Sequence, residues 1–403
     1  MKKEDGFDKF RVLVLSLGHM VNDSYSNVVP PLLPMLQAVY GLTYTLSGMI
    51  MTVFTFTSSV IQPVFGYFSD RHGRRWMVAL SVLWISFFMS MIGIVGYLGF
   101  DATGTYIVIL ALVGMAGFGS SAYHPQASSM VPRISGNRKG LGVSIFSAGG
   151  NLGYAIMPLM VVPVTKIWGM PGVLVLFIPG LIMSFVLQRY APEAPVAAVQ
   201  PKISEIWADI RAVIKPLSIV TGVVCMRAWL FFGLLTFLTS YMVNIQNESP
   251  EIASVFLSVL LFFGAVGTLI GGHASDTYGR KFVIALSLLL TGPLLFLALS
   301  TNGILMLVLL ALAGVALLAS FSPAVLIAQG LIPKNQGVAS GIVLGFAIGI
   351  GGLGVSVTGY IADTFGLTVG VYSLVLLPVI GLLLTLLLPG KLAPEVVGVR
   401  YAK

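Results

Sequence analysis

Apolar segments of about 20 residues or more recur along the whole chain, and this feature constrains the fold more than any other. A helix of that length crosses the roughly 30 Å hydrocarbon core of a bilayer at 1.5 Å per residue. Helix is the expected form, because a membrane barrel would show short alternating strands. The sequence therefore predicts an all-α membrane protein with twelve transmembrane helices, near residues 11–37, 43–66, 77–99, 104–128, 139–162, 168–189, 216–243, 252–272, 281–299, 302–328, 335–360 and 367–389.

The composition agrees with a lipid-facing surface. Charged residues make up 9% of the chain and hydrophobic residues 57%, whereas soluble proteins carry about 25% charged residues. A net charge of +8 could indicate binding to nucleic acid, but the basic residues lie in short clusters between apolar spans. We expect the lipid bilayer and no nucleic acid as a partner. The single cysteine, Cys225, allows no disulfide.

The basic residues also predict the orientation of the chain. If both termini are cytoplasmic, 20 of the 22 Lys and Arg residues fall in cytoplasmic segments. Lys166 is then the basic residue of the outer loops, and Arg227 lies within a span. This asymmetry follows the positive-inside rule. We therefore predict a multi-pass protein of the cytoplasmic (inner) membrane with both termini cytoplasmic.

An internal repeat divides the chain into two halves. Residues 66–75 read GYFSDRHGRR, and residues 272–281, 206 positions later, read GHASDTYGRK. The longest connection, 190–215, separates six spans from six and contains ISEIWADIRAVI, whose pattern predicts an amphipathic helix on the inner membrane surface. The predicted domains are an N-terminal six-helix bundle (1–189), a linker (190–215) and a C-terminal six-helix bundle (216–403).

The paired motif resembles that of the major facilitator superfamily, G-x-x-x-D-R-x-G-R-R between spans two and three. Three stretches, GHMVNDSYSNVVPPLLPML, GFGSSAYHPQASSMVP and FSAGGNLGYAIMPL, are similar to the fosmidomycin-resistance branch of bacterial drug exporters. The resemblance implies two pseudo-symmetric halves that alternate access to a central cavity lined by spans one, four, seven and ten.

Two features depart from the antiporters of this superfamily. Many of them carry an arginine in span four, and this span has none. Their span-five motif is matched only in part by Gly149, Gly150, Gly153 and Pro158. The direction of transport therefore stays open at this point.

Two charged residues, Asp23 and Arg227, are expected near mid-membrane. A charge there costs about 2.5–3.5 kcal/mol on insertion scales, so each needs a partner or water. We predict that Asp23 carries the transported proton and that His19, one helical turn away, relays the proton or tunes the site. The alternative is a structural ion pair between Asp23 and Arg227 without a role in transport.

Arg227 is the predicted centre of the substrate site. Its guanidinium does not release a proton at physiological pH, and it binds carboxylate, phosphate or phosphonate oxygens with two parallel hydrogen bonds. Polar and aromatic residues of spans one, four, five and seven are secondary candidates: His124, Tyr25, Asn22, Tyr123, Tyr154 and Trp229. A structural role is the alternative for His124, and packing is the alternative for Trp229.

The repeated motif predicts a conformational gate. Gly66 and Gly272 are expected to allow tight helix contact, Asp70 to lie at the start of span eleven, and Asp276 to lie near the start of span five, where helix amide groups favour a carboxylate. The residues assigned to this gate are Gly66, Asp70, Arg71, Gly73, Arg74, Arg75, Gly272, Asp276, Gly279 and Arg280.

These features favour a transporter over other classes of protein. The sequence shows no G-x-x-x-x-G-K-[ST] phosphate loop and no Cys/His metal pattern, so we expect no enzyme activity, no cofactor and no metal. We predict a monomeric, proton-driven transporter of small molecules, most directly for fosmidomycin-like drug efflux. The alternative is proton-coupled uptake of a small organic anion. A receptor or scaffold without transport is a third option, which the mid-membrane charges argue against.

Overall fold

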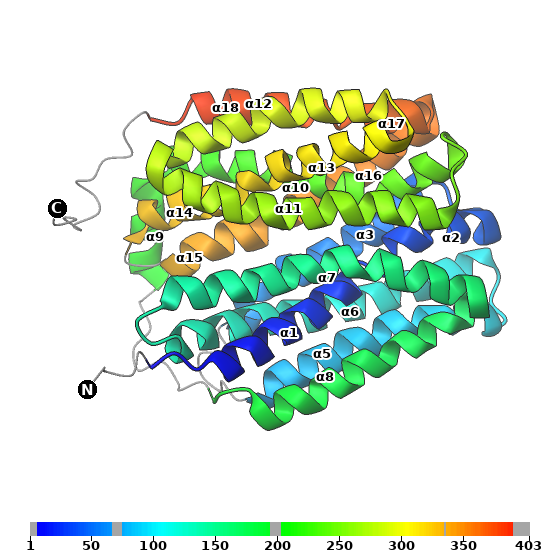
Figure 1. Cartoon of the computed structure of the whole chain (residues 1–403), viewed down its shortest axis with the longest axis horizontal. Coiled ribbons are helices and arrows are strands. Elements are labelled where there is room, and N and C mark those ends of the chain that lie inside the picture. Colours follow the sequence, from blue (N-terminus) through cyan, green and yellow to red (C-terminus); the bar gives the residue numbers. More distant parts are fainter. Residues whose placement is uncertain (1–5, 67–74, 194–202, 334–335, 390–403) are drawn as a thin grey trace.

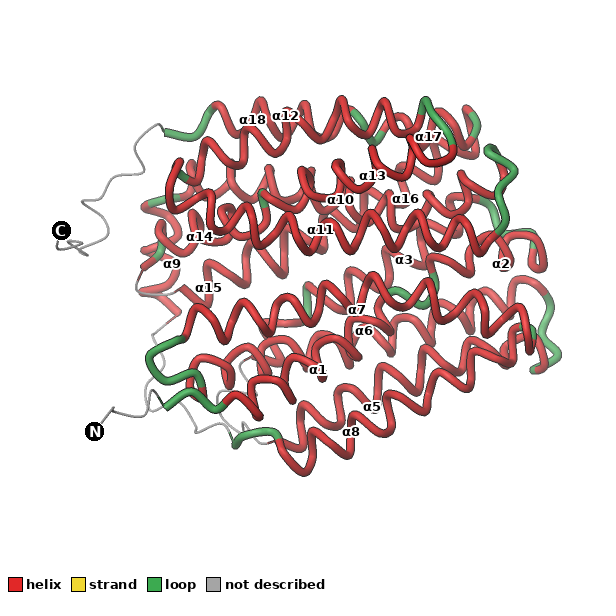
Figure 2. The backbone as a smooth tube through the Cα atoms, in the orientation of Figure 1, coloured by secondary structure: helices red, strands yellow, loops and turns green. Residues whose placement is uncertain are grey.

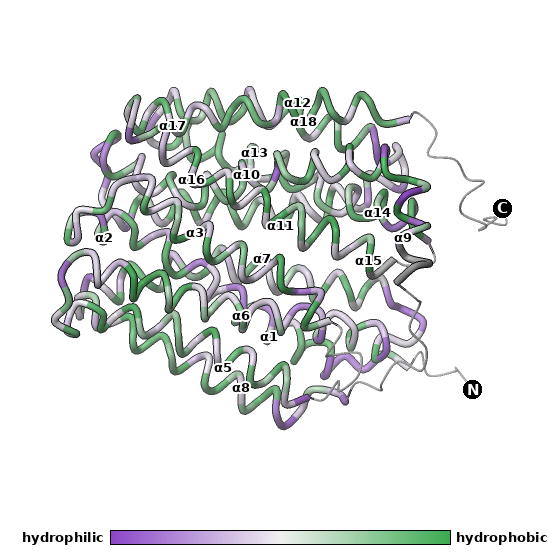
Figure 3. The backbone as a smooth tube through the Cα atoms, turned by 180° about the vertical axis from the view of Figure 1, so that it is seen from behind, coloured by the Kyte–Doolittle hydropathy of each residue, from purple (hydrophilic) through white to green (hydrophobic). Residues whose placement is uncertain are grey.

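The computed structural model describes residues 6–66, 75–193, 203–333 and 336–389, and every regular element in this part of the chain is helical. The helices run roughly along one direction, and most loops gather at the two ends of the bundle (Figure 2). Among the described residues, eleven helical segments are long and apolar enough to cross a membrane. Their positions match the second to the twelfth predicted spans. Hydrophobic residues dominate along the helices, while α1 and α6 also carry hydrophilic ones (Figure 3).

The first half of the chain forms one group of helices, drawn in blue to green (Figure 1). Prolines occur inside two of its long helices, α6 and α7. The elements are α1 (Lys9–Ser26), η1 (Pro30–Leu32), α2 (Leu33–Tyr40), α3 (Tyr44–Ser59), α5 (Arg75–Met91), η2 (Ile92–Tyr97), α6 (Ala102–Ile134), α7 (Lys139–Trp168), η3 (Met170–Leu176) and α8 (Phe177–Tyr190).

The second half follows after α9 (Ile203–Ala212), which confirms a helix at the predicted amphipathic segment. One of its elements, η5, is a π-helix within the eleventh predicted span. The elements are α10 (Ile214–Asn244), α11 (Pro250–Tyr278), α12 (Arg280–Leu299), α13 (Gly303–Ala319), α14 (Phe321–Leu331), α15 (Gln336–Ser340), η5 (Gly341–Phe346), α16 (Ala347–Phe365), α17 (Leu367–Ser373) and α18 (Leu376–Leu386).

The first predicted span is a broken helix. The side chain of Asp8 caps the start of α1 by accepting a 3.0 Å hydrogen bond from the Arg11 amide. The helix ends at Ser26, and the chain continues through the short η1 turn into α2. Pro30 and Pro31 have no backbone N–H to donate, so they interrupt the helical hydrogen bonds. α1 also carries three charged residues, which explains why it is more polar than the eleven apolar segments.

The bundle has two distinct ends (Figure 1). The described chain begins at Gly6 and finishes at Pro389 on the same side, where α9, α14 and α15 also lie; we call this side the terminal end. The opposite side, which holds α2 and α17, is the far end. In the orientation predicted from loop charge, the terminal end is cytoplasmic and the far end is extracytoplasmic.

Packing within each group is close, and two helix pairs join the groups. α1 packs against α5, α6, α7 and α8, whereas α11 packs against α12, α13 and α14. The groups meet through α3 against α16 and α7 against α11. Glycine permits such close approach: a Cβ at Gly352 would lie 1.9 Å from the Thr55 hydroxyl oxygen. The predicted domain boundaries at residues 189 and 216 stay a prediction.

A carboxylate of the second half caps a helix of the first half at the far end. Asp363, near the end of α16, accepts 2.8 Å hydrogen bonds from the backbone amides of Tyr44 and Thr45 and a 2.5 Å bond from the Thr45 hydroxyl. The unpaired amides and the dipole of a helix N-terminus both favour a carboxylate there. We call these contacts of Asp363, Tyr44 and Thr45 the far-end clasp.

Four further polar contacts join the halves near the clasp. Thr239 donates to the Pro30 carbonyl over 3.1 Å, and Ser240 donates to the Gln37 side chain over 3.3 Å. The others are a hydrogen bond from Asn244 to the Tyr44 hydroxyl and an ion pair between Lys166 and Glu251. The far end is therefore held together by side chains from both halves.

The predicted gate is seen only in part. Asp70, Arg71, Gly73 and Arg74 lie outside the described residues. Arg75 pairs with Glu193, with 2.6 Å between Nε and Oε1, and Arg280 donates to the Leu326 carbonyl over 3.0 Å. Asp276 is exposed and forms no hydrogen bond or ion pair with another described residue. Its predicted place near the start of the fifth span stays a prediction.

The tight contacts expected at Gly66 and Gly272 are not found. A Cβ at either position would lie 3.7 Å from its nearest neighbour, which is ordinary van der Waals contact. The close approach in α11 occurs one residue earlier, where a Cβ at Gly271 would lie 2.0 Å from the Ala319 carbonyl oxygen. Gly279 has φ +89° at the junction of α11 and α12, a conformation that favours glycine.

Candidate functional site

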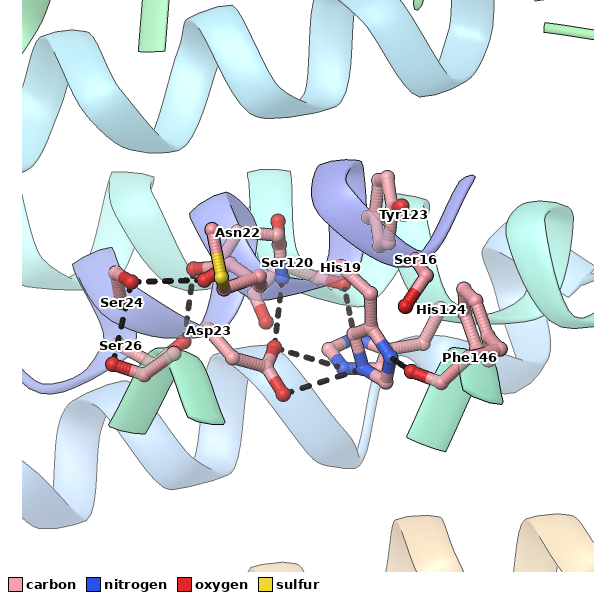
Figure 4. A network of polar contacts seen from close by, with 12 residues as sticks. Ser16, His19, Asn22, Asp23, Ser24, Ser26, Ser120, Tyr123, His124 and Phe146 are labelled. Carbon is pink, nitrogen blue, oxygen red and sulfur yellow. Dashed lines mark hydrogen bonds and ion pairs between the residues drawn. The ribbon is translucent and has the colours of Figure 1, made fainter. Parts of the chain in front are cut away.

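The carboxylate of Asp23 lies between two imidazole rings (Figure 4). Its Oδ2 is 3.2 Å from Nε2 of His19, one turn earlier in α1, and its Oδ1 is 3.2 Å from Nε2 of His124 in α6. Asp23 is only 5% exposed. The structure thus confirms the predicted proximity of His19 to Asp23 and adds His124, which the sequence had placed with the substrate residues. We call these three residues the proton cluster.

Backbone carbonyl groups orient both rings. Nδ1 of His19 lies 2.8 Å from the Phe146 carbonyl oxygen, and the His19 ring stacks on the Phe146 ring at 4.1 Å. Nδ1 of His124 lies 2.8 Å from the carbonyl oxygen of Ser120, one turn earlier in α6. A carbonyl oxygen only accepts hydrogen bonds, so each Nδ1 donates and each Nε2 is left to face the carboxylate.

A glycine of α7 makes room for the cluster. A Cβ at Gly150 would lie 2.5 Å from Cε1 of His19, 2.6 Å from its Nε2 and 2.7 Å from Oδ2 of Asp23. A side chain at this position would therefore displace the imidazole or the carboxylate. The sequence indicated Gly150 only as part of a glycine-rich motif, not as a wall of the site.

Asparagines complete the polar face of α1. Nδ2 of Asn22 donates to Oδ1 of Asp23 over 3.1 Å, and Nδ2 of Asn27 donates to the Tyr154 carbonyl oxygen over 2.6 Å. The Asn22 side-chain oxygen is buried and has no partner among the described residues. Asn22 therefore supports the carboxylate and keeps one buried acceptor unpaired beside it.

The cluster is also the kind of donor set that metal sites use. The ligand atoms of His19, Asp23 and His124 lie within 4.8 Å of one another, although 101 residues separate Asp23 from His124 in the sequence. Each 3.2 Å gap between nitrogen and oxygen has the length of a direct hydrogen bond. The three side chains can therefore share protons directly.

Arg227 lies in a different environment. Its side chain leaves α10, is 4% exposed, and places its guanidinium 4.7 Å from the centre of the Phe321 ring. Its Nε is buried and has no hydrogen-bond partner among the described residues. Within this part of the chain no ion pair joins Arg227 to Asp23. The structural ion pair that the sequence left as an alternative is therefore not formed in this structure.

Two tyrosines predicted as substrate contacts use their hydroxyl groups to hold helices together. The Tyr25 hydroxyl donates to the Leu176 carbonyl and accepts a 2.9 Å hydrogen bond from the Gly180 amide. The Tyr123 hydroxyl donates to the Leu15 carbonyl over 2.9 Å. Both side chains are buried. These bonds favour the structural alternative for Tyr25 and Tyr123.

Two other predicted contacts differ in their surroundings: Trp229 packs within the second half, and Tyr154 packs across the two halves. Trp229 donates from Nε1 to the Thr358 hydroxyl over 2.9 Å and packs on Gly354, where a Cβ would lie 2.1 Å from the indole. Tyr154 of α7 packs edge to face against Phe231 of α10, with ring centres 6.0 Å apart. Tyr154 thus connects the first half to the helix of Arg227, whereas Trp229 is engaged in packing.

Two surface recesses open at opposite ends of the bundle. One, of about 430 Å³, lies at the terminal end and is lined by Arg11, Arg75, Met130, Arg133, Ile134, Ala191, Pro192 and Glu193. The other, of about 440 Å³, lies beside the far-end clasp and is lined by Pro34, Gln37, Ala38, Gly41, Leu42, Thr43, Tyr44, Asn244 and Asp363. Neither recess includes the proton cluster or Arg227.

Membrane-length helices arranged in two groups, with ionisable side chains buried inside them, define a polytopic transport protein. The chain belongs to the major facilitator superfamily, whose model matches residues 15–264 and 223–400. This membership confirms the predicted family and the twelve-helix major facilitator fold. It also establishes the general class of the protein, a multi-pass transporter of small molecules.

Individual relatives agree with this membership. The chain is 33% identical to the uncharacterized MFS-type transporter YfnC of Bacillus subtilis (strain 168) over 93% of this chain and 92% of the relative. It is 30% identical to the fosmidomycin resistance protein of Escherichia coli (strain K12) over 93% of this chain and 91% of the relative. These two relatives match almost the whole chain rather than one half of it.

Solved structures show the same fold. A bacterial homologue of the human lysosomal transporter Spinster superposes with a TM-score of 0.80 at 16% identity, covering 95% of this chain and 97% of that one. The nucleoside transporter NupG superposes with a TM-score of 0.77 at 12% identity, covering 94% and 99%. At these identities the likeness concerns the fold alone.

Proposed function

We propose that this protein is a proton-coupled secondary transporter of the cytoplasmic membrane, which moves small molecules by alternating access. The observation that carries the proposal is the buried proton cluster. A carboxylate held between two imidazoles exchanges protons within one hydrogen-bonded unit, and such groups inside membrane spans mark proton relays. Asp23 is the proposed carrier, with His19 and His124 as its partners, and the proton gradient replaces any cofactor as the energy source.

The far-end clasp supports alternating access. It joins α3 and α16, which belong to different halves, so opening the far end requires Asp363 to leave the amides of Tyr44 and Thr45. In the proposed orientation this end is the outer gate. The repeated motif at the terminal end, from Gly66 to Arg75 and from Gly272 to Arg280, is the proposed inner gate. One polypeptide contains both gates, so we propose a monomer as the working unit.

The orientation has a direct test. Single cysteines are placed at Asn302 and at Asn137 in a Cys225→Ser background, and intact cells are treated with a membrane-impermeant maleimide. We expect labelling at position 302 and none at position 137. The reverse pattern would place the termini outside and exchange the two gates.

The proposed substrate carries an anionic group that binds Arg227. A buried guanidinium without a carboxylate partner among the described residues is costly, and an incoming carboxylate, phosphate or phosphonate would supply the missing charge and hydrogen bonds. Fosmidomycin is a phosphonate, and one relative is named a fosmidomycin resistance protein. We therefore propose efflux of fosmidomycin-like anionic drugs as the primary function.

Fosmidomycin provides the test of this proposal. The gene is expressed in a host that lacks its own fosmidomycin exporter, and growth is compared with and without the drug. Expression should protect the cells. Everted vesicles from these cells should accumulate the drug when a proton gradient is imposed and stop when nigericin collapses the pH difference. Accumulation that ignores the gradient would refute proton coupling.

Arg227 also supports a second function, the proton-coupled uptake of a small organic anion. An anion site with a permanent cation serves import equally well when proton and substrate enter together. Vesicles of both orientations separate the two functions. Efflux predicts accumulation in everted vesicles with the interior acidified, whereas symport predicts accumulation in right-side-out vesicles with the exterior acidified.

A further inference from the structure

We propose that the proton cluster binds two exchangeable protons at once, one on each side of Asp23, and that His124 is the group through which they exchange with water. This inference deepens the proposed function, because it assigns the capacity and the entry point of the proton site. It also moves His124 from the predicted substrate contacts to the proton site. The argument depends on the geometry of the three side chains.

The first step fixes where the imidazole protons are. Nδ1 of His19 faces the Phe146 carbonyl, and Nδ1 of His124 faces the Ser120 carbonyl, both at 2.8 Å. A carbonyl has no hydrogen to donate, so both Nδ1 atoms carry one. These two protons hold the rings in place and are not the ones that the cluster exchanges.

The second step counts the protons between the rings and the carboxylate. Nε2 of His19 faces Oδ2 of Asp23, and Nε2 of His124 faces Oδ1, each at 3.2 Å. Without a hydrogen in the gap, the lone pairs of a neutral imidazole nitrogen and a carboxylate oxygen would repel each other. Each gap therefore holds one proton, bound either to nitrogen or to oxygen. Because the two contacts use different oxygens, the cluster as described holds two.

The third step follows the charge. With both gaps filled the cluster has a net charge of +1, wherever the protons sit, because two imidazolium ions and one carboxylate give the same sum as one imidazolium, one neutral imidazole and a carboxylic acid. Loss of one proton gives a neutral cluster, and loss of both gives −1. The cluster can therefore release two protons in sequence, and each loss breaks one contact with Asp23.

The fourth step identifies the entry point. The side chain of His19 is 11% exposed and that of Asp23 8% exposed, whereas that of His124 is 30% exposed. His124 is therefore the member that water reaches. The other titratable groups on the helices packed around α1 are Tyr106 and Tyr123 on α6 and Tyr154, Lys139 and Lys166 on α7, together with Arg133, Arg75, Arg189 and Tyr190 near the terminal end of α6, α5 and α8.

Nitrogen NMR on histidine tests the count. The full-length protein, labelled with ¹⁵N-histidine, purified in detergent and treated with a chelator, is titrated with acid and base. The chain has four histidines, and single substitutions assign their signals; exposed His273 serves as the control. We expect the Nδ1 atoms of His19 and His124 to stay protonated and two protons to leave the cluster in separate steps. Release of a single proton, or an unprotonated Nδ1, would overturn the proposal.

Variants test the roles of the members. Asp23→Asn should remove the coupling, so that His19 and His124 titrate independently of each other. His124→Gln should leave one exchangeable proton and slow its exchange with water, whereas His273→Gln should change neither. Unchanged exchange in His124→Gln would overturn the assigned entry point.

Proteoliposomes separate this inference from the proposed function. With fosmidomycin as the probe, the wild type should move up to two protons per substrate and His124→Gln one. If the titration shows two protons while drug transport ignores the pH gradient, the inference stands and the proposed coupling fails. If transport is coupled but the titration shows one proton, the inference fails and the proposed function stands.

Discussion

The two halves of the molecule treat their buried charges in opposite ways. In the first half, Asp23 touches three side chains, and both histidines are anchored to backbone carbonyls. In the second half, Arg227 is as deeply buried, but its guanidinium lies over the face of Phe321 and its Nε has no hydrogen-bond partner among the described residues. A cation–π contact is worth about 0.5–2 kcal/mol, less than the several kcal/mol needed to desolvate a charge.

This difference separates two tasks that one fold must perform. A proton site works when its groups stay in contact and share protons. A network in which each group has a hydrogen-bond partner meets this requirement. A site for an anionic substrate works when its cation is unpaired until the substrate arrives, because a permanent carboxylate partner would compete. The comparison therefore agrees with the proposed function, in which the first half carries the proton and the second half binds the charge of the substrate.

Removing the carboxylate is the strongest way to break this comparison. Asp23→Asn keeps the size of the side chain but cannot hold the charge that both imidazoles face. We expect proton-driven transport to fall to the background of empty vesicles, while substrate counterflow without a gradient is retained because Arg227 is untouched. Uptake into vesicles with and without an imposed pH gradient measures both. Normal dependence on the gradient in this variant would exclude Asp23 as the carrier.

Filling the space at Gly150 should have the next largest effect. The added methyl of Gly150→Ala would overlap His19 and Asp23 at 2.5–2.7 Å, and overpacking of this kind costs about 1–3 kcal/mol. We expect most of the gradient-driven transport to be lost with the protein still folded. Gly292→Ala is the matched control, since its methyl would meet its nearest neighbour at 3.7 Å and Gly292 lies in α12, outside the cluster and the gates. Equal activity of the two variants would show that the packing around the cluster does not matter.

The variant Arg227→Lys tests the proposed substrate role of the buried charge in the second half. Arg227→Lys keeps the charge but loses the planar pair of donors, so we expect the affinity for an anionic substrate to fall about tenfold, ~1.4 kcal/mol. Arg189→Lys is the control, because Arg189 also lies over an aromatic ring, at 5.5 Å from the centre of Tyr190, but near the end of α8. Concentration-dependent uptake gives the affinities. Unchanged affinity in Arg227→Lys would remove it from the substrate site.

Weakening the far-end clasp should have the smallest effect of the four changes. Asp363→Asn removes the charge from a helix-capping contact worth about 1 kcal/mol, so the far end should open roughly fivefold more often. A cysteine at Val243 in a Cys225→Ser background should then react faster with a thiol reagent. Asp101→Asn is the control, because Asp101 caps α6 within its own half, accepting from the Gly104 amide over 2.7 Å. Similar acceleration in both variants would show a general loosening instead.

Much of the fold could be predicted from the sequence, because the length and apolarity of a span are local properties. The spans from 43–66 onward match described helices, and the amphipathic segment forms α9. The break after α1 was not part of the predicted span 11–37, since prolines disfavour a helix locally but do not reveal whether the chain continues straight. The tight helix contact predicted at Gly272 was wrong, because the position of such a contact depends on how the partner helix is turned. The structure places Gly271, rather than Gly272, against Ala319.

The site could be predicted only where its members are close in sequence. His19 and Asp23 are four residues apart, so helical periodicity brings them together. His124 and Gly150 reach the same carboxylate from other helices, and no local pattern states which way those helices turn. The alternative of an ion pair between Arg227 and Asp23 is not formed in this conformation, because two opposite charges at similar depth need not lie on facing sides of the bundle.

The far-end clasp has a consequence for genetics. Two of its three donors are backbone amides, at Tyr44 and Thr45, and every residue type except proline supplies one. Mutations that loosen this contact should therefore concentrate at codon 363. A substitution at codon 44 or 45 keeps the backbone amide and removes one side-chain bond, that of the Tyr44 or the Thr45 hydroxyl. A genetic selection for variants whose outer face opens more easily should therefore find few positions in the clasp. Most of these mutations should lie in the second half, although both halves form the contact.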